Sequence, residues 1–173
     1  TVAGDPAAIY GALRQHQPVQ YGGLVCLGEP TVMTLSPELF FATEGREISV
    51  RPMKGTARRG ETPHEDAALA GAMRADEKSR AENLMIVDLL RNDLGRVSEI
   101  GSVRVTDLYS VETYPTLHQM TSGIVSRLRP DVGVTELFAS LFPCGSVTGA
   151  PKIRAMEIIR ELETSPRGAY CGA

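Results

Sequence analysis

The sequence predicts an α+β protein in which helices cover antiparallel β-sheet. Two observations support this prediction. Short segments rich in β-branched and aromatic residues dominate the first third of the chain, and segments of helical periodicity alternate with further strands after it. With 173 residues, 42% of them hydrophobic and 23% charged, the chain has the composition of a globular domain that buries a core of its own.

The first predicted element is a helix. Asp5 is a typical N-cap and Pro6 suits the first helical position, so we expect a helix from Asp5 to about Gln15. Four short strands, separated by Gly, Glu-Pro and Ser-Pro, are then expected to form an antiparallel meander. The next stretch, 51–63, is polar, and we predict it to be irregular. The four strands are 21–27, 31–35, 39–43 and 47–51.

Helices and strands are interleaved in the rest of the chain. The longest helix is predicted over 66–93, with a break near Ala75-Asp76 and with Gly95 as its stop signal. Two strands, two helices and a loop of small residues follow it. The strands are 102–112 and 121–128, the helices are 134–142 and 151–163, and the loop between the helices is 144–150.

Two of these helices carry an apolar face that we expect to be buried. In the long helix, the face is formed by Ala81, Leu84, Met85, Val87, Asp88 and Leu89. In the last helix, it is formed by residues at three-residue and four-residue steps, namely Ile153, Met156, Ile159 and Leu162.

Charge and composition exclude several classes of function. The chain has 18 basic and 21 acidic residues, no Trp and 5% aromatic residues, which argues against a nucleic-acid partner. No apolar run approaches the roughly 18 residues of a membrane span, which argues against a membrane partner. Cys26, Cys144 and Cys171 form no CxxC pair, so we predict a reducing, cytoplasmic location.

The two ends predict that the chain is part of a larger domain. The sequence opens at Thr1 rather than Met, and it closes with Tyr170-Cys171-Gly172-Ala173, a small and apolar run that resembles the start of a strand. Natural termini are usually polar and expendable. We therefore expect a domain that is incomplete at both ends.

The small-residue loop is a candidate anion site. A helix N-terminus offers free N–H groups and about half a positive charge. Ser146, Thr148 and Gly149 would let a carboxylate approach these groups closely. Because the lysine that follows is not spaced as in a Walker A loop, a carboxylate is favoured over a nucleotide. An ordinary glycine-rich turn into a helix explains the same residues equally well.

Lys54 is a candidate nucleophile. It follows a predicted strand and is flanked by Gly55 and Thr56. Partial desolvation and the neighbouring arginines 51, 58 and 59 would favour a neutral amine, which is a competent nucleophile or base. The alternative is an inert surface lysine, which is the commoner case.

Three further residues have both a chemical and a structural interpretation. Glu82 borders the predicted apolar face of the long helix, where it could bind Mg²⁺ or only pair with a neighbouring lysine or arginine. Glu38 and His118 are candidate acid–base groups. A histidine between apolar neighbours is also an ordinary core residue.

Four segments together resemble one family, the chorismate-utilising enzymes. They are SPELF at 36–40, PMKGT at 52–56, RAENLMIVDLLRNDLG at 80–95 and FPCGSVTGAPK at 142–152. The similarity runs over almost the whole chain, and it implies a chorismate-binding fold like that of anthranilate synthase component I. Anthranilate synthases have alanine where this chain has Lys54, whereas lysine resembles the aminodeoxychorismate synthase component I branch.

The resemblance also implies roles for particular residues. Lys54 would attack C2 of chorismate, Glu38 and His118 would act near the ring as acid–base groups, and Glu82 would bind Mg²⁺. A glutamine amidotransferase partner would supply ammonia, and the product, 4-amino-4-deoxychorismate, leads to para-aminobenzoate and folate. The remaining matched positions would line the substrate pocket: Gly55, Thr56, Ser146, Thr148, Gly149 and Tyr170.

Two alternatives remain at this point. The chain could instead resemble anthranilate synthase component I or another chorismate-converting enzyme in activity. It could also be a catalytically inactive fragment that only folds or self-associates. The resemblance implies that further strands, a substrate-binding arginine and other metal-ligand glutamates lie beyond it, so we expect the isolated chain to be crippled or inactive.

Overall fold

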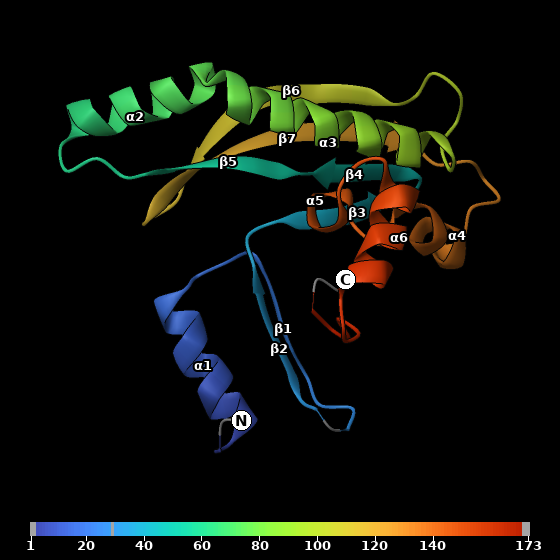
Figure 1. The fold of residues 1–173 in the computed structure, drawn as a ribbon, viewed down its shortest axis with the longest axis horizontal. Coiled ribbons are helices and arrows are strands. Elements are labelled where there is room, and N and C mark those ends of the chain that lie inside the picture. Colours follow the sequence, from blue (N-terminus) through green and yellow to red (C-terminus); the bar gives the residue numbers. More distant parts are fainter. Residues whose placement is uncertain (1–2, 29, 171–173) are drawn as a thin grey trace. The chain divides into compact units, whose positions relative to one another are not determined.

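The computed structural model describes residues 3–28 and 30–170, and the chain divides into two compact units, Thr1–Leu39 and Phe40–Ala173. The first unit contains α1 (Pro6–His16), β1 (Tyr21–Val25) and β2 (Val32–Ser36). β3 (Leu39–Glu44) begins at the boundary, and all later elements belong to the second unit. Figure 1 shows the order of these elements along the chain.

The first unit confirms the predicted N-terminal helix and corrects the predicted meander. The Asp5 carboxylate accepts hydrogen bonds from the N–H groups of Ala7 and Ala8 at 3.3 and 3.1 Å, which begins α1 as expected. β1 and β2 pair antiparallel, with Val25 opposite Val32. In the described residues these two strands form a sheet of their own, so the four early strands are not one continuous meander.

The second unit is built on a sheet in which one long strand is central. The sheet order is β3-β4-β7-β5, and β6 also pairs with β7. β4 (Glu47–Arg51) pairs with the C-terminal half of β7 (Leu117–Arg127), and β5 (Met53–Arg58) pairs with its N-terminal half. β6 (Arg104–Thr113) runs along most of β7. All these pairings are antiparallel, which confirms the predicted α+β class.

The stretch 51–63 was predicted to be irregular, and this prediction is wrong over its first half. β5 occupies 53–58 in it and carries Lys54 and Gly55. The strand is polar because it lies at the end of the sheet order, where one edge has no neighbouring strand in the described sheet. Only Met53 is fully buried in β5, so the apolar signal on which sequence prediction depends is weak here.

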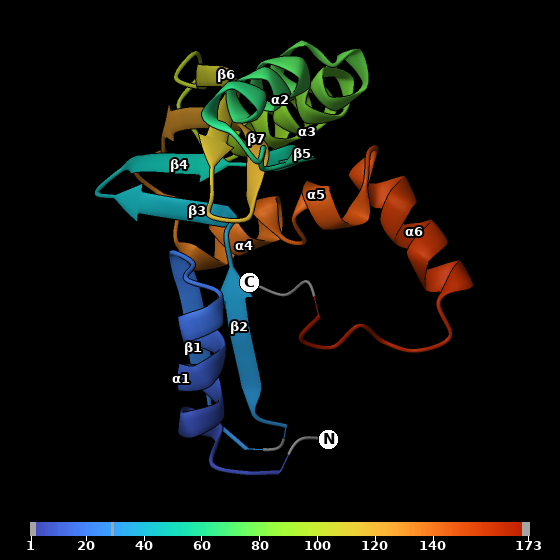
Figure 2. The same ribbon diagram turned by 90° about the vertical axis from the view of Figure 1, so that its left-hand side faces the viewer.

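Two helices cover one face of this sheet, as Figures 1 and 2 show. α2 (Pro63–Ala75) begins three residues earlier than predicted, because Thr62 is its N-cap and accepts a hydrogen bond from the Glu65 N–H. α3 (Glu77–Gly95) follows directly. The predicted break is confirmed: the Asp76 carboxylate accepts the Ser79 N–H at 2.7 Å and starts α3.

The buried face of α3 differs from the predicted one. Its buried residues are Asn83, Ile86, Val87, Leu90, Asp93 and Leu94. Leu84 and Met85, which were expected on that face, are 42% and 45% exposed. Because α3 has apolar residues on two faces, periodicity alone does not show which of them meets the sheet.

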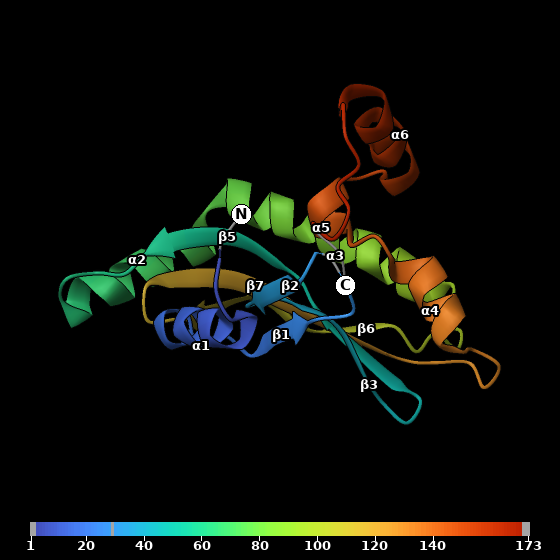
Figure 3. The ribbon, with the colours of Figure 1, turned by 90° about the horizontal axis from the view of Figure 1, so that it is seen from below.

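Three helices end the described chain: α4 (Val134–Leu141), α5 (Gly145–Thr148) and α6 (Lys152–Leu162). The predicted small-residue loop therefore contains a short helix. The buried stripe predicted for α6 is wrong, since the helix has no buried residue and Ile153 is 68% exposed. Figures 2 and 3 show α6 extending away from the sheet, so its apolar side chains have no sheet to pack against.

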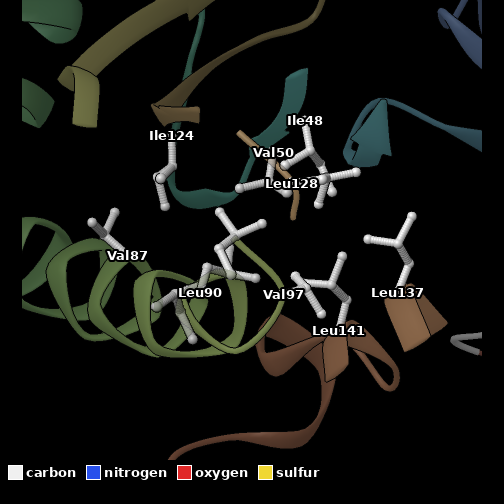
Figure 4. Close-up of a cluster of buried hydrophobic side chains, with 11 residues drawn as sticks. Ile48, Val50, Val87, Leu90, Val97, Ile124, Leu128, Leu137 and Leu141 are labelled. Carbon is white, nitrogen blue, oxygen red and sulfur yellow. The ribbon is translucent and has the colours of Figure 1, made fainter. Parts of the chain in front are cut away.

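The main core lies between the sheet, α3 and α4, and Figure 4 shows it. β4 contributes Ile48 and Val50, and β7 contributes Ile124. The helices α3 and α4 contribute most of the other residues, and Val97 and Leu128 lie just after the ends of α3 and β7. Among the described residues, no helix combines the length and the apolar character that crossing a membrane requires. The strand expected at 170–173 begins in a turn at Tyr170, and its other residues lie outside the described part of the chain.

Candidate functional site

Lys54 lies on β5, and its side chain reaches the turn that precedes α6. The Lys54 Nζ atom donates a hydrogen bond to the Ser146 carbonyl oxygen at 3.1 Å, in a half-buried position. Two residues that are 92 positions apart in the chain are thus held together. A lysine that is fixed in this way loses less side-chain entropy when it reacts than a freely rotating one.

Gly55 explains how β5 can approach α3 so closely. Its φ angle is +98°, and an added Cβ would lie 3.1 Å from the Ser79 Cβ and 3.3 Å from the Met120 Cβ. The strand register also shifts between Met53 and Thr56, which marks an irregularity at Lys54. A side chain at position 55 would strain the backbone at this φ angle and would crowd Ser79 and Met120, directly beside Lys54.

The short helix α5, residues Gly145–Thr148, is called the α5 turn below, and it lies against α3, as Figure 3 shows. A Cβ added to Gly145 would lie 2.1 Å from the Leu89 Cδ2 atom, so the backbone of the turn touches the helix. The hydroxyl groups of the turn are engaged inside it: Thr148 Oγ1 donates to the Cys144 carbonyl at 3.2 Å, and Ser146 Oγ lies 3.1 Å from Cys144 Sγ. The predicted carboxylate cradle stays a prediction.

A groove of about 500 Å³ opens beside this turn. Thr148 and Tyr170, two predicted substrate-binding residues, both line it. Arg167 fixes its far wall by donating from Nη1 to the Val147 carbonyl at 3.1 Å. Further residues that line the groove are Phe142, Met156, Ile159 and Arg160.

A buried ion pair ties the start of α6 to the end of α3. Lys152 Nζ lies 2.5 Å from Asp93 Oδ2, and the two side chains are 11% and 4% exposed. The same Nζ donates to the Leu141 carbonyl at 3.1 Å, and Ser140 Oγ donates to the Asp93 carbonyl at 2.7 Å. The ends of α3, α4 and α6 therefore meet at one point, and the α5 turn is closed between them.

His118 lies on β7 and is buried, with 1% of its surface exposed. Its Nε2 atom lies 2.9 Å from Asp66 Oδ1, and its Nδ1 atom lies 3.0 Å from Thr113 Oγ1. Both ring nitrogens are thus engaged by protein groups. The acid–base role expected of His118 stays a prediction.

Asp66 is the centre of this polar cluster. Its two carboxylate oxygens each accept from the Arg59 guanidinium at 2.8 Å, and Oδ1 also accepts from the Gly60 N–H at 2.7 Å. The hydrogen bonds from Arg59, followed by those from Gly60 and His118, hold the pKa of the Asp66 carboxyl well below its ordinary value. The carboxylate is therefore ionised at neutral pH, and it accepts a hydrogen bond from the N–H group at His118 Nε2.

Glu82 is the expected metal ligand, and it lies on the face of α3 that does not meet the sheet. Its side chain is 48% exposed and makes a loose ion pair with Lys78, with 3.8 Å between Oε1 and Nζ. The described residues contain no group of three or more His, Cys, Asp or Glu that could hold a metal. One accessible carboxylate fits a Mg²⁺ ion whose other ligands are water and substrate oxygens.

Glu38 lies in the first unit, in the turn between β2 and β3. It is half-buried, and its N–H donates to Ser36 Oγ at 3.2 Å. Thr56, in the second unit, donates from Oγ1 to Gln119 Oε1 at 3.0 Å. Of the predicted residues, the structure therefore joins Lys54, Gly55 and Thr56 on β5 with the turn that carries Ser146, Thr148 and Gly149.

Sequence reasoning missed the polar residues that hold these groups in place. Asp66 and Arg59 around His118, and the Asp93–Lys152 pair behind the α5 turn, gave no local signal. Arg59 is 7 residues from Asp66, but His118 is 52 residues from it and Lys152 is 59 residues from Asp93. The available hint was an acidic residue on the buried face of a helix, because a buried carboxylate needs a cation or hydrogen-bond donors.

Comparison with known proteins places these observations in a family. An aminodeoxychorismate synthase from Streptomyces griseus is 50% identical over 170 residues, which are 97% of this chain and 23% of that protein. Anthranilate synthase component 1 from Methanothermobacter thermautotrophicus is 44% identical over 170 residues, which are 98% of this chain and 37% of that protein. The chain thus spans less than two-fifths of the length of either relative.

The fold agrees with these relatives. The crystal structure of anthranilate synthase component I from Streptococcus pneumoniae matches with a TM-score of 0.88 at 38% identity, over 99% of this chain and 38% of that one. Residues 1–173 also match the family of chorismate binding enzymes. The resemblance found in the sequence motifs is therefore confirmed, and the chain belongs to the chorismate binding enzyme family.

Proposed function

We propose that this chain forms part of an enzyme that aminates chorismate to 4-amino-4-deoxychorismate, with Lys54 as a covalent nucleophile. The observation that carries the proposal is the Lys54 side chain itself, whose Nζ atom is held 3.1 Å from the Ser146 carbonyl oxygen. Ser146 directly precedes Val147 and Thr148, which line the groove. The family resemblance implies that anthranilate synthases have alanine at the position of Lys54. Two groups of enzymes that share a fold but form different products are expected to differ at the residue that reacts with the substrate.

The chemistry divides one difficult substitution into two easier ones. The neutral Lys54 amine forms a bond to C2 of chorismate, the two conjugated ring double bonds shift from C1=C2 and C5=C6 to C1=C6 and C4=C5, and the C4–O bond breaks so that the protonated hydroxyl leaves as water. Ammonia then forms a bond to C4, both double bonds shift back, and the C2–N bond breaks to release the lysine. An acid must give a proton to the leaving hydroxyl, and Glu38 is the residue we propose for it.

The Ser146 carbonyl has a defined part in this proposal. As an acceptor it orients the Lys54 amine before reaction, and a neutral amine still has an N–H to donate to it. A carbonyl places no positive charge beside Lys54, and it leaves the nitrogen lone pair free to point elsewhere. The α5 turn thus positions the nucleophile while the backbone of Gly55 keeps β5 close to α3.

Metal and partner complete the proposal. Glu82 would contribute one carboxylate to Mg²⁺, which would neutralise a carboxylate of chorismate when both are bound. Ammonia would come from a glutamine amidotransferase subunit, as the resemblance implies. The groove beside Thr148 and Tyr170 is wide enough for a small dicarboxylate and has Arg160 and Arg167 in its lining.

A second candidate is an anthranilate synthase activity. The Methanothermobacter relative and the Streptococcus structure, both named as anthranilate synthases, support it through overall similarity. That similarity extends over the same residues as the similarity to the aminodeoxychorismate synthase, so it does not discriminate between products. Position 54 supports the first candidate, because a lysine can form the C2 adduct and an alanine cannot.

The test uses the full-length gene product with chorismate, Mg²⁺ and an ammonium salt, and it analyses the product by chromatography. We expect 4-amino-4-deoxychorismate from the wild type and its loss in Lys54→Ala, with any remaining amination shifted to C2. Arg74→Ala, which removes an exposed cation from the last turn of α2, is the control and should leave the product unchanged. Full 4-amination by Lys54→Ala would refute the lysine mechanism.

A separate titration decides what the 173-residue chain does alone. Chorismate and Mg²⁺ are added to the chain while its thermal unfolding is followed. A stabilisation by both together would show that the groove and Glu82 bind on their own. No shift, together with self-association in sedimentation, would identify the chain as a folding unit that needs further polypeptide to act.

A further inference from the structure

His118 has contacts that differ from those of a proton shuttle. A shuttle needs one ring nitrogen that can reach the substrate, directly or through one water. Here Nε2 is bonded to Asp66 and Nδ1 to Thr113, and the residue is 1% exposed. The ring therefore has no nitrogen left for a ligand unless one of these bonds breaks inside the core.

The bonds of His118 join four elements at one end of the sheet. His118 is the second residue of β7, where it pairs with Thr113 of β6 and Ala57 of β5. Asp66 belongs to the first turn of α2. Through Asp66 the contact continues to Arg59 and Gly60, the two residues that directly follow β5.

Arg59 connects Asp66 to the segment between β6 and β7. Its guanidinium donates to both oxygens of Asp66 at 2.8 Å, and its Nη1 donates to the Tyr114 carbonyl at 2.7 Å. The residue is thus fixed both to α2 and to the turn between β6 and β7. Because Arg59 is five residues from Lys54 on the same extended segment, a displacement at this end of β5 can be transmitted along the strand to Lys54.

β5 is therefore held at two points with Lys54 near one of them. One point is Gly55, packed against Ser79 and Met120, and the other is Arg59, bonded to Asp66. If the second point is released, the end of β5 beyond Gly55 is held only by its pairing with β7 on one side. Edge strands with one partner fray more readily than central ones.

We propose that His118, together with Asp66, is a positioning residue that locks the end of β5 and so places Lys54, and that it exchanges no proton with the substrate. This inference rests on the proposed function of Lys54. It assigns the cluster of His118, Asp66 and Arg59 to alignment of the nucleophile. It also predicts that His118 acts by donating a hydrogen bond from Nε2–H to Asp66, and that its ability to take up a proton is not required.

Two substitutions distinguish the contribution of the His118 Nε2 hydrogen bond from that of the Nδ1 hydrogen bond. Glutamine at 118 can present an amide N–H near the Nε2 position, whereas the shorter asparagine can reach only toward Thr113. In the full-length gene product, we expect His118→Gln to keep kcat/KM within about threefold of the wild type and His118→Asn to lose about tenfold or more, because a bond to a charged carboxylate is lost. His64→Gln, on the exposed side of α2, is the matched control.

The pH profile of kcat/KM decides between positioning and proton transfer. We expect the profile of His118→Gln to superimpose on that of the wild type apart from its height. A general acid or base typically contributes about 10²- to 10⁴-fold, so its removal would cost that much and would delete one limb of the profile. A lost limb in His118→Gln would overturn the proposal.

A second measurement does not depend on activity. Hydrogen exchange is followed at the β5 amides in the 173-residue chain. We expect faster exchange in His118→Asn and Asp66→Asn, and exchange like the wild type in His118→Gln. Equal exchange in all variants would refute the lock even if Lys54 is the nucleophile, whereas failure of Lys54→Ala to change the product would refute the proposed function and leave the lock standing.

Discussion

The helices α3 and α6 have similar apolar patterns but very different surroundings. α3 buries Ile86, Val87, Leu90 and Leu94 against the sheet and α4, with all four at most 2% exposed. α6 leaves Ile153 and Leu162 68% and 74% exposed. An apolar stripe thus shows that a helix can be buried, and the fold around it determines whether it is.

The two helices are nevertheless connected. The Asp93–Lys152 ion pair joins the C-terminal end of α3 to the N-terminal end of α6, and Gly145 packs on Leu89 just before it. The α5 turn lies between these two contacts and carries the carbonyl that accepts from Lys54. The well-packed helix α3 therefore holds the α5 turn, whose Ser146 carbonyl accepts the hydrogen bond from Lys54, the proposed nucleophile.

The largest effect is expected from breaking this connection. Lys152→Met leaves Asp93 as an unpaired charge in the core, which we expect to destabilise the second unit by about 3–5 kcal/mol. Denaturant unfolding followed by circular dichroism measures the loss. The double variant Asp93→Asn/Lys152→Met is the control, and it should recover most of the stability. A single variant as stable as the wild type would show that the pair does not hold the two helices.

The contrast between the two apolar faces predicts the next effect. Leu90→Ala in α3 creates a cavity and should cost about 2–5 kcal/mol in unfolding free energy. Leu162→Ala in α6, which removes the same atoms from an exposed site, should change it by less than about 0.5 kcal/mol. Equal losses from the two variants would mean that α6 is packed in solution, and the comparison between the helices would then fail.

The close approach of the α5 turn to α3 predicts a smaller effect. Gly145→Ala forces the Leu89 side chain to move, which we expect to cost about 1–3 kcal/mol. Gly71→Ala in α2 is the matched control, since an added Cβ there meets nothing within 4 Å. The control should gain about 0.5–1 kcal/mol from the higher helix propensity of alanine. A neutral Gly145→Ala variant would show that the turn is not held against the helix.

The smallest effect is a dependence on pH. The lowered pKa of Asp66 in the folded protein means that the unfolded chain binds more protons near pH 4, so stability rises with pH there. The contribution of Asp66 is complete at neutral pH and is lost as the pH falls below about 4 toward the pKa of the folded state. Asp66→Asn should therefore be less stable at pH 6 and should depend less on pH between 4 and 2. An unchanged dependence would exclude Asp66 as a source of acid sensitivity.

Local chemistry made part of this fold predictable. Asp5-Pro6 and Asp76 are capping signals that act within a few residues, and the structure has helices beginning at both. β5 escaped prediction because its polar residues reflect its edge position, which is set by pairing with a strand about 60 residues later. The exposure of the apolar stripe of α6 was not predicted for the same reason, because burial depends on residues that are distant in the sequence.

In the candidate site too, some features could be predicted from the sequence and others could not. Lys54, Glu38 and Glu82 were found because motifs place them, whereas their surroundings were not predictable. The Ser146 carbonyl has no sequence signal, since every residue has one, and only the fold brings it to Lys54. Asp66 and Asp93 gave no signal because a buried carboxylate is recognised by its partners, and these are 7 to 59 residues away.

The most direct test of the central claim is peptide-level mass spectrometry of the full-length gene product incubated with chorismate and Mg²⁺ in the absence of ammonia. If Lys54 is the nucleophile, the peptide that contains it should carry the mass of chorismate less one water, and ammonium should then release the adduct as aminated product. An unmodified Lys54 peptide in a protein that aminates chorismate at C4 when ammonium is added would contradict the account.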